Sequence, residues 1–357
     1  MSDRTQHLVD LLAGEEVDVL LVSSPLNLRY MTGYTGSNGL ALIGPQTRVF
    51  VTDFRYVEQA EQEVEASYDR RRDQQDLLNA IPKALLEGRV RLGFDDAGLT
   101  VRQHEKLREL LPGRVELVSA GGLVEKLRAV KELAEIDKIR VATDVADAAL
   151  TQLLEQGLAG RTERELATAL ERAMIDRGAS RPSFDSIVAA GPHGALPHAR
   201  PRNVAVGRDE LVVIDWGAEV DGYCSDCTRT LAAGEPSSEA REVYELVLAA
   251  QLTGLEAVRA GVGGREVDAA ARAVIEAGGH GEHFGHGLGH GVGTEVHEAP
   301  RLSMRSEDEL ETGNVVTVEP GVYLPGKLGV RIEDLVVVGE DGCEILTSLE
   351  KALTVVA

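Results

Sequence analysis

The amino-acid sequence predicts an α+β protein with two domains, a smaller α/β domain followed by a larger domain made of two related halves. Over residues 1–122, short β-rich segments alternate with helical segments, the pattern of an α/β domain. Over residues 123–357, a pair of long helices followed by antiparallel strands occurs twice. The length of 357 residues also fits two domains, at about 150 residues per domain.

The composition is that of a foldable and strongly acidic chain. Hydrophobic residues make up 43% of it, enough to bury a core, and the net charge is −22. Nucleic acids and anionic membranes are excluded as partners, because both require clustered Lys and Arg. No apolar segment approaches the roughly 18 residues of a membrane-spanning helix. The first residues lack the basic-then-apolar pattern of a signal peptide, so we expect a soluble, cytoplasmic protein.

The first domain is expected to alternate strands and helices. Clusters of β-branched and aliphatic residues predict strands at 17–22, 40–43, 49–51 and 90–94. Helices are predicted at 54–66 and 101–111, the second opened by a capping box at Thr100-Val-Arg-Gln103. The segment contains neither a G-x-G-x-x-G motif nor a P-loop. The small residues Ser119-Ala-Gly-Gly122 mark the expected boundary between domains 1–122 and 123–357.

The second domain repeats its own layout. Helices are predicted at 131–156, 162–177, 239–259 and 265–277, and strands at 186–190, 211–229 and 314–338. The segment AGRTERELATALERAMIDRG from Ala159 resembles AGVGGREVDAAARAVIEAGG from Ala260, at a constant offset of 101 residues (260 − 159). We infer two related halves, each a helix pair with antiparallel strands and each with one carboxylate-bearing hairpin.

The first hairpin, IDWGAEVDGYCSDCTR, contains Asp215 and Asp226. A four-residue loop at 219–222 would place these two aspartates directly opposite each other, where like charges repel. Two facing carboxylates in an apolar hairpin need a cation between them, or one must hold a proton. The alternative interpretation is an exposed turn with scattered acidic residues.

The second hairpin, VVTVEPGVYLPGKLGVRIEDLVVV, is symmetric about Gly326, so Glu319 and Glu333 are expected to face each other. Both lie in valine-rich segments, where burying an unpaired carboxylate is costly. Four carboxylates on one face of a duplicated fold indicate a site for divalent cations such as Mn, Co or Zn.

Histidines and cysteines add to this pattern. Five of the nine histidines lie in HGEHFGHGLGHGVGTEVH, residues 280–297, and we expect at least one of them to be a metal ligand. The three cysteines argue against a disulfide framework. Cys224 and Cys227 form a CxxC, but a zinc knuckle would need a second pair, so both are interpreted as small buried residues.

Several of these motifs resemble those of the pita-bread metallopeptidases. DWGAEVDGYCSDCTRT, GHGLGHGVGTEVHEAP, TVEPGVY and VRIED are similar to motifs of the Xaa-Pro peptidases in that family, prolidase and aminopeptidase P. YMTGYTGSNG and TDFRYVEQA are similar to the amino-terminal domain of the same proteins. The resemblance implies a pita-bread catalytic domain preceded by a creatinase/prolidase-like domain.

The resemblance also implies a centre with two divalent ions per chain, Mn, Co or Zn. Asp215 would hold one ion, Asp226 and Glu333 would bridge both, and His290 with Glu319 would complete the second.

Further roles follow from the same resemblance. Glu319 would transfer the proton of the attacking water to the leaving proline nitrogen. His198 would contact the substrate near the scissile bond, and His297 would stabilise the tetrahedral intermediate. Arg331, two residues before Glu333 and on the same strand face, would orient that carboxylate. Tyr323 and His286 also match positions of the family's substrate site.

The expected reaction is hydrolysis of the bond between an N-terminal residue and proline. The Xaa-Pro amide has no N–H, so recognition must rely on the proline ring and the free amino end. We favour Xaa-Pro dipeptides over the longer peptides of aminopeptidase P, with a homodimer as the assembly. Arg55, presented by a partner subunit or a closed lid, would bind a free proline carboxylate; alternatively it is an ordinary surface arginine.

Other members of the fold fit less well. Methionine aminopeptidase normally lacks an N-terminal α/β domain, and a creatinase-type enzyme lacks the complete set of metal ligands. A non-catalytic pita-bread binding protein would typically have lost ligands, and none is lost in this sequence.

Overall fold

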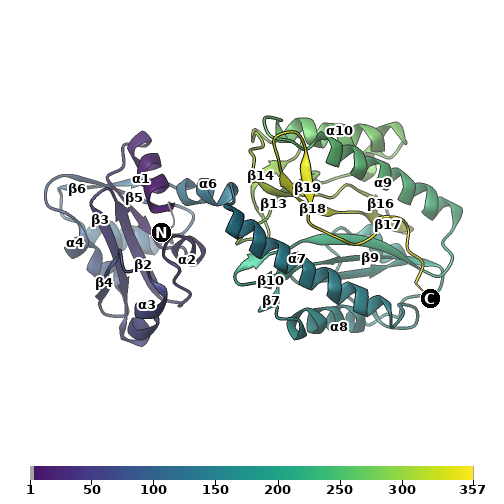
Figure 1. The fold of residues 1–357 in the computed structure, drawn as a ribbon, viewed down its shortest axis with the longest axis horizontal. Coiled ribbons are helices and arrows are strands. Elements are labelled where there is room, and N and C mark those ends of the chain that lie inside the picture. The colour runs from purple at the N-terminus through teal and green to yellow at the C-terminus, as the bar shows by residue number, and fades with distance from the viewer. Residues whose placement is uncertain (1–3, 357) are drawn as a thin grey trace. The chain divides into compact units, whose positions relative to one another are not determined.

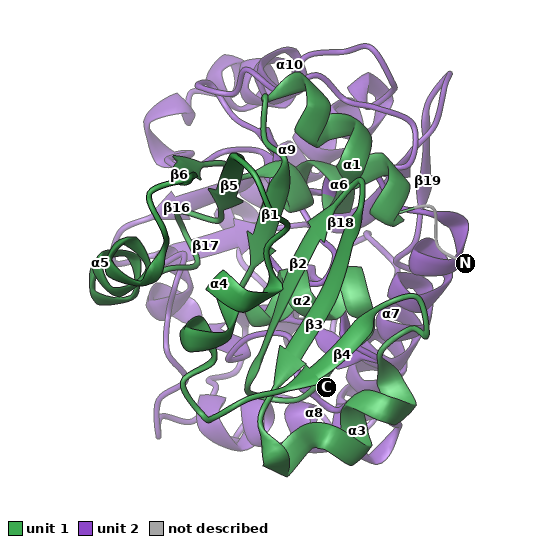
Figure 2. Cartoon of the chain, turned by 90° about the vertical axis from the view of Figure 1, so that its left-hand side faces the viewer, with its two compact units in different colours: residues 1–128 green, residues 129–357 purple. Residues whose placement is uncertain are grey.

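The structure, a computed structural model, describes residues 4–356 of the chain. The chain forms two compact units, Met1–Arg128 and Ala129–Ala357, coloured separately in Figure 2. The division lies near the end of helix α6 (Leu123–Ala129). None of the helices in residues 4–356 is both long and apolar enough to cross a membrane.

The first unit is built on one mixed sheet. Its strands are β1 (Val19–Val22), β2 (Gly39–Gly44), β3 (Thr47–Thr52), β4 (Asp69–Arg72), β5 (Val90–Phe94) and β6 (Val115–Ser119). They lie in the order β4-β3-β2-β1-β5-β6 (Figure 2). The pairs β1/β5, β5/β6 and β3/β4 are parallel, whereas β1/β2 and β2/β3 are antiparallel.

Helices cover both faces of this sheet. They are α1 (Arg4–Gly14), α2 (Pro25–Thr32), α3 (Val57–Glu63), α4 (Ile81–Ala84) and α5 (Val101–Leu110), with 3-10 turns η1 (Phe54–Tyr56) and η2 (Leu77–Ala80). Side chains alternate between the faces of a strand, so Leu20 and Val22 pack in one core with α1 and α2. Val19 and Leu21 pack in the other core with α4 and α5.

Sequence and structure differ at several elements of the first unit, and helices α1, α2, α4 and α6 were not predicted. The helix predicted at 54–66 is shorter: it begins as η1, capped by Asp53, and α3 ends at Glu63. Strands β4 and β6 were not predicted, because β4 is a largely exposed, arginine-rich edge strand and β6 is only half-buried. The capping box that opens α5 at Thr100 and Gln103 is confirmed.

The second unit contains four long helices and two sets of strands. The helices are α7 (Leu133–Leu154), α8 (Glu163–Asp176), α9 (Ser238–Ala257) and α10 (Gly264–Ala277), with 3-10 turns η3 (Gly191–Ala195) and η4 (Gly281–His283). The first set of strands is β7 (Arg181–Pro182), β8 (Ile187–Ala190), β9 (Glu210–Trp216), β10 (Ala218–Val220), β11 (Tyr223–Cys224) and β12 (Cys227–Ala233). The second set is β13 (Gly289–Gly291), β14 (Glu298–Leu302), β15 (Val315–Val318), β16 (Gly321–Leu324), β17 (Leu328–Arg331), β18 (Asp334–Val338) and β19 (Cys343–Ile345).

The duplication predicted from the sequence is confirmed. The sheet order β8-β9-β12 in the first half corresponds to β13-β15-β18 in the second, and every one of these pairs is antiparallel. The core under α7 and α8 is formed mostly by the first half, and the core under α9 and α10 mostly by the second. Figure 1 shows α9 and α10 on one side of the strands and α8 on the other.

The register predicted for the first hairpin was wrong by two residues. Asp215 pairs with Thr228, not with Asp226, because Asp221 and Gly222 form a two-residue turn between Val220 and Tyr223. Both turn residues have positive φ, 49° and 80°, a conformation that matches the twist of a hairpin. A shift of two residues leaves Asp215 and Asp226 on the same face of the strands.

The register predicted for the second hairpin is confirmed. Val318 pairs with Asp334 on one side and Gly321 with Arg331 on the other, so Glu319 and Glu333 occupy matching positions between them. Pro320 has no N–H to donate, and the ladder is interrupted there. Instead, the Glu333 N–H donates to the Thr228 carbonyl oxygen of the other half at 3.1 Å. The two halves therefore meet at the carboxylates.

Candidate metal centre and active site

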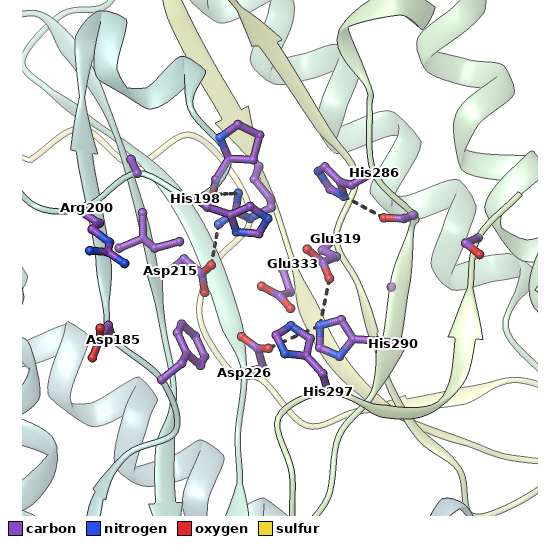
Figure 3. Close-up of a pocket in the computed structure, with 18 of the residues that line it drawn as sticks. Asp185, His198, Arg200, Asp215, Asp226, His286, His290, His297, Glu319 and Glu333 are labelled. Atoms are coloured by element: carbon purple, nitrogen blue, oxygen red, sulfur yellow. Dashed lines mark hydrogen bonds and ion pairs between the residues drawn. The ribbon is translucent and has the colours of Figure 1, made fainter. Parts of the chain in front are cut away.

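A cavity of about 510 Å³ lies in the second unit. Its wall contains the five predicted metal ligands and three predicted site histidines: Asp215, Asp226, His290, Glu319, Glu333, His198, His286 and His297 (Figure 3). Arg331 also lines the cavity. Tyr323 is buried behind this wall and contacts it through Arg331 and His286. Arg55 belongs to the first unit and does not line the cavity.

Three of the predicted ligands form a tight cluster. One ligand atom each from Asp226, His290 and Glu333 lies within 4.8 Å of the other two. His290 Nε2 is 3.7 Å from Asp226 Oδ2 and 3.2 Å from Glu319 Oε1. The Asp226 and Glu333 side chains are almost fully buried. Buried oxygen and imidazole ligands at these separations suit a divalent cation.

Local hydrogen bonds fix the orientation of the ligands. His290 Nδ1 lies 3.1 Å from the Gly291 carbonyl oxygen, to which it donates, so Nε2 is the ring nitrogen that faces the carboxylates. The Thr317 hydroxyl donates to Glu319 Oε1 at 3.1 Å, and the Thr228 hydroxyl donates to Glu333 Oε2 at 2.7 Å. These threonines were not identified from the sequence, although each lies two residues from a ligand on the same strand face.

Positive protein charge balances the four buried carboxylates only in part. Burial, together with the nearby carboxylate of Glu333, raises the pKa of Asp226 well above its ordinary value. Burial and the charge of Glu319 do the same to the pKa of Glu333. Burial also raises the pKa of Glu319, but the hydrogen bond and charge of His290 outweigh burial and lower this pKa to about 2. All four carboxylates can ionise together only if cations compensate them.

One oxygen of the cluster also lacks a partner. Asp215 Oδ1 is buried and has no hydrogen-bond partner among residues 4–356, whereas Oδ2 accepts from Arg331 Nη2 at 2.5 Å. A buried unpaired carboxylate oxygen costs free energy unless something binds it. The residues of the cavity therefore fit the divalent ions that the sequence predicts.

Arg331 has a different direct partner from the one predicted. Its guanidinium binds Asp215, and it connects to Glu333 only through the hydroxyl of Thr228, which accepts from Arg331 Nε at 2.9 Å. Arg331 Nη1 also donates to the Tyr323 hydroxyl at 2.9 Å, and that hydroxyl lies 2.9 Å from His286 Nε2. These side chains form one polar network from Asp215 to His286.

The two remaining histidines lie at different sides of the cluster. Figure 3 shows His198 near Asp215, and His297 beside His290, with 4.3 Å between the two ring centroids. Burial, assisted by the positive charge of His290, lowers the pKa of His297 to about 4. His297 is therefore neutral at neutral pH and has one N–H available as a donor.

Arg55 forms an ion pair within the first unit. Its Nε and Nη2 donate to the two oxygens of the buried Asp53 carboxylate at 3.0 and 2.8 Å. Its side chain is 42% exposed. Its role in the active site stays a prediction.

The duplicated fold and the carboxylate-lined cavity define a metallopeptidase of the pita-bread type. The chain belongs to metallopeptidase family M24, whose sequence profile matches residues 137–340, and residues 4–130 match the creatinase/prolidase N-terminal domain. The resemblance stated from the sequence motifs is therefore confirmed. Methionine aminopeptidase is disfavoured by the N-terminal match.

Its relatives include proteins named for both of the expected activities. A Xaa-Pro dipeptidase of Pyrococcus furiosus is 35% identical, over 99% of this chain and 100% of that protein. The solved structure of a Xaa-Pro dipeptidase from Bacillus anthracis superimposes with a TM-score of 0.95 at 40% identity, covering 99% of both chains. That of an X-Pro aminopeptidase from Thermotoga maritima superimposes with a TM-score of 0.91 at 38% identity, covering 99% of this chain and 100% of the other.

Proposed function

We propose that this metallopeptidase hydrolyses the bond between an N-terminal residue and proline, using two divalent ions per chain. The observation that carries this proposal is the convergence of all five ligand-type residues on one cavity, including a buried carboxylate oxygen without a partner. The names of the relatives, Xaa-Pro dipeptidase and X-Pro aminopeptidase, support the choice of substrate class. A non-catalytic binding protein would have no use for a complete ligand set.

Each ligand has a place in the proposed centre. Asp215 would hold one ion, Asp226 and Glu333 would bridge both, and His290 with Glu319 would complete the second. When bound, Mn, Co or Zn ions supply Lewis acidity that lowers the pKa of a water molecule to near neutrality. Thiolates are not among these ligands, which disfavours copper(I) and iron–sulfur chemistry.

The remaining steps use the protein's own side chains. Glu319 is ionised at neutral pH, so it can accept the proton of the attacking water and pass it to the proline nitrogen as the bond breaks. Neutral His297 can donate its N–H to the oxygen that becomes negatively charged. His198 would contact the substrate near the scissile bond, and the network of Arg331, Tyr323 and His286 would hold the rest of the site in place.

We favour dipeptides as the substrates and a homodimer as the assembly, in which Arg55 of the partner subunit would bind the free proline carboxylate. The second candidate is an aminopeptidase P acting on longer Xaa-Pro peptides, which the similarity to the Thermotoga maritima structure favours.

A paired assay tests both parts of the proposal. The protein is stripped of metal with a chelator, reloaded with Mn, Co or Zn, and assayed for hydrolysis of Ala-Pro, of Ala-Pro-Yaa-Zaa and of Ala-Ala as a control. We expect no hydrolysis without metal and cleavage of the proline peptides after reloading. Full activity of the stripped protein, or equal cleavage of Ala-Ala, would contradict the proposal. The ratio of the rates on the two proline peptides decides between dipeptidase and aminopeptidase.

A further inference from the structure

Glu163 is a buried carboxylate that the site described above does not use. It is the first residue of α8, its side chain is 1% exposed, and it does not line the cavity. A buried charge is costly unless hydrogen bonds compensate it. The sequence alone suggests no more than an acidic residue in the first turn of a helix, beside the capping box of Thr162 and Glu165.

The carboxylate accepts five hydrogen bonds from a single stretch of chain. Oε1 accepts from the Ala190 backbone N–H at 3.1 Å and from Arg202 Nη2 at 2.8 Å, and it lies 3.0 Å from His193 Nδ1. Oε2 accepts from the Arg202 backbone N–H at 2.9 Å and from its Nε at 3.0 Å. Burial raises the pKa of Glu163, but the bonds from Arg202 and its neighbours outweigh burial, so the group is ionised.

The segment between these contacts carries part of the cavity wall. Ala190 ends β8, and residues 191–202 contain only the short turn η3, so no strand ladder holds them. Pro197, His198, Ala199, Arg200 and Pro201 line the cavity. Glu163 binds both ends of this segment, and Arg331 Nη1 donates to its Pro197 carbonyl oxygen at 3.3 Å. The carboxylate thus closes the base of the loop that presents His198.

The other half of the duplicated fold performs the same task differently. At the offset of 101 residues, Glu163 corresponds to Gly264, the first residue of α10 (264 − 163). A side chain at Gly264 would overlap with the carbonyl oxygen of Arg301, which lies just after His297. In the first half, the start of α8 contacts the segment that carries His198. In the second half, the start of α10 contacts the segment that follows His297. The second half does so through close backbone packing, and the first through a side chain.

We propose that Glu163 is a positioning residue whose carboxylate fixes segment 190–202, so that His198 faces the substrate. The proposal rests on the proposed function in its assignment of His198 to the substrate site. Backbone bonds from Glu163 to Val204 and from Arg164 to Arg202 do not involve the carboxylate. A substitution of the carboxylate therefore leaves the attachment of α8 in place.

The test compares Glu163→Gln with Glu165→Gln in the metal-loaded enzyme. Glu165 is also in the first turn of α8, but its carboxylate is exposed and bonds only Thr162 among the contacts of residues 4–356. We expect Glu163→Gln to lower kcat on Ala-Pro by about ten- to a hundred-fold, the size of effect that a displaced catalytic group produces, with the same metal content. Glu165→Gln should retain the wild-type rate.

A double-mutant cycle separates positioning from a general loss of structure. If Glu163 acts through His198, Glu163→Gln should have little further effect in a His198→Ala background. An undiminished effect in that background, or a loss of metal from Glu163→Gln alone, would overturn the proposal.

A measurement without substrate keeps the proposal separate from the proposed function. Hydrogen exchange of the backbone amides in residues 190–204 should be faster in Glu163→Gln than in wild type, with residues 210–233 unchanged. Equal exchange in the two proteins would overturn the positioning role. If the wild-type enzyme cleaved no Xaa-Pro peptide, the proposed function would fail while the exchange result still stood.

Discussion

At the scale of single residues, the centre is a set of carboxylates whose orientation comes from neighbouring hydroxyl and guanidinium groups. Thr228 illustrates this, because its hydroxyl donates to Glu333 and accepts from Arg331, which also binds Asp215. Carboxylates held in this way lose little conformational freedom when they bind a cation.

The two carboxylates proposed as bridges should be the most sensitive ligands. Asp226→Ala or Glu333→Ala would leave both ions short of a ligand. We expect activity to fall by more than the about 10- to 100-fold that outer contacts typically contribute. Metal analysis should find fewer than two ions per chain. Asp185→Ala is the matched control, because this exposed aspartate lines the same cavity outside the cluster and should leave metal content unchanged.

Replacing either of the two substrate-site histidines should lower activity without lowering the metal content. His297→Ala should lower kcat by about 10²–10³-fold, as expected for the loss of one donor to the developing oxyanion. His198→Ala should also lower turnover strongly. Both variants should still bind two metal ions per chain in equilibrium dialysis. A drop to one ion or none would show that these histidines are metal ligands instead.

Cys224 and Cys227 should be unreactive in the folded protein. Burial raises the pKa of Cys224 to about 12 and that of Cys227 well above its ordinary value. A raised pKa lowers the thiolate fraction, for Cys224 to about one in ten thousand at pH 8, and the thiolate is the reactive form. Alkylation at pH 8 should therefore modify the half-buried Cys343 first. In denaturant all three thiols should react. Rapid labelling of Cys224 in the folded state would contradict its burial.

At the scale of secondary-structure elements, the glycines beside His290 allow two strands to approach closely. A side chain at Gly289 would overlap with the carbonyl oxygen of Thr317, a backbone atom that cannot rotate away. Gly289→Ala should therefore destabilise the protein by about 1–3 kcal/mol and weaken metal binding by displacing His290. Gly285→Ala is the control, since a side chain there meets nothing within 4 Å. Thermal unfolding with and without metal measures both effects. Equal midpoints for the two variants would contradict this account.

The two hairpins show how much of this geometry a sequence can predict. The arms of the second hairpin are symmetric about Gly326, and its register was predicted correctly. In the first hairpin, Asp221 adopts the positive φ that a two-residue turn requires, and this choice shifted the register by two. The strand face of each ligand was still predicted correctly, because a shift of two residues does not change it. The pairing of Asp215 with Thr228 was not predicted.

Contacts between the two halves of the second unit were harder to predict from the sequence than the hairpin registers. The ligand types were identified from motifs, whereas the bond of Arg331 to Asp215 depends on how strands of both halves pack. The anchoring of segment 190–202 by Glu163 likewise joins residues that are separated in sequence and form no repeating pattern. Periodicity predicts elements and their faces, but not which side chains meet across an irregular loop.

At the scale of the whole molecule, the first unit is proposed to set the length of the substrate through Arg55. Two of the five guanidinium N–H groups bind Asp53, so three remain for a proline carboxylate. Arg55→Ala should weaken cleavage of Ala-Pro by about ten- to a hundred-fold, equivalent to about 1.5–3 kcal/mol, and spare longer Xaa-Pro peptides.

Arg71→Ala is the matched control for this prediction. Arg71 belongs to the same unit, pairs with Asp69 at 2.7 Å, and has a side chain that is 40% exposed, close to the 42% of Arg55. Arg71→Ala should leave the cleavage rates of both the short and the long peptides unchanged. An equal loss on short and long peptides with Arg55→Ala would indicate a role in folding or assembly, and no loss on either would leave Arg55 as a surface residue.

The division of the ligands between the two halves has a consequence for how the protein matures. Asp215 and Glu333 are 118 residues apart (333 − 215), and they line one cavity only when strands from both halves have packed. At about 5–20 residues per second, a ribosome needs about 6–24 s to synthesise that stretch. During this interval the nascent chain displays Asp215 and Asp226 without the residues that complete the centre. The complete centre therefore cannot form before the second half has been synthesised, and we expect metal uptake to follow the synthesis of both halves.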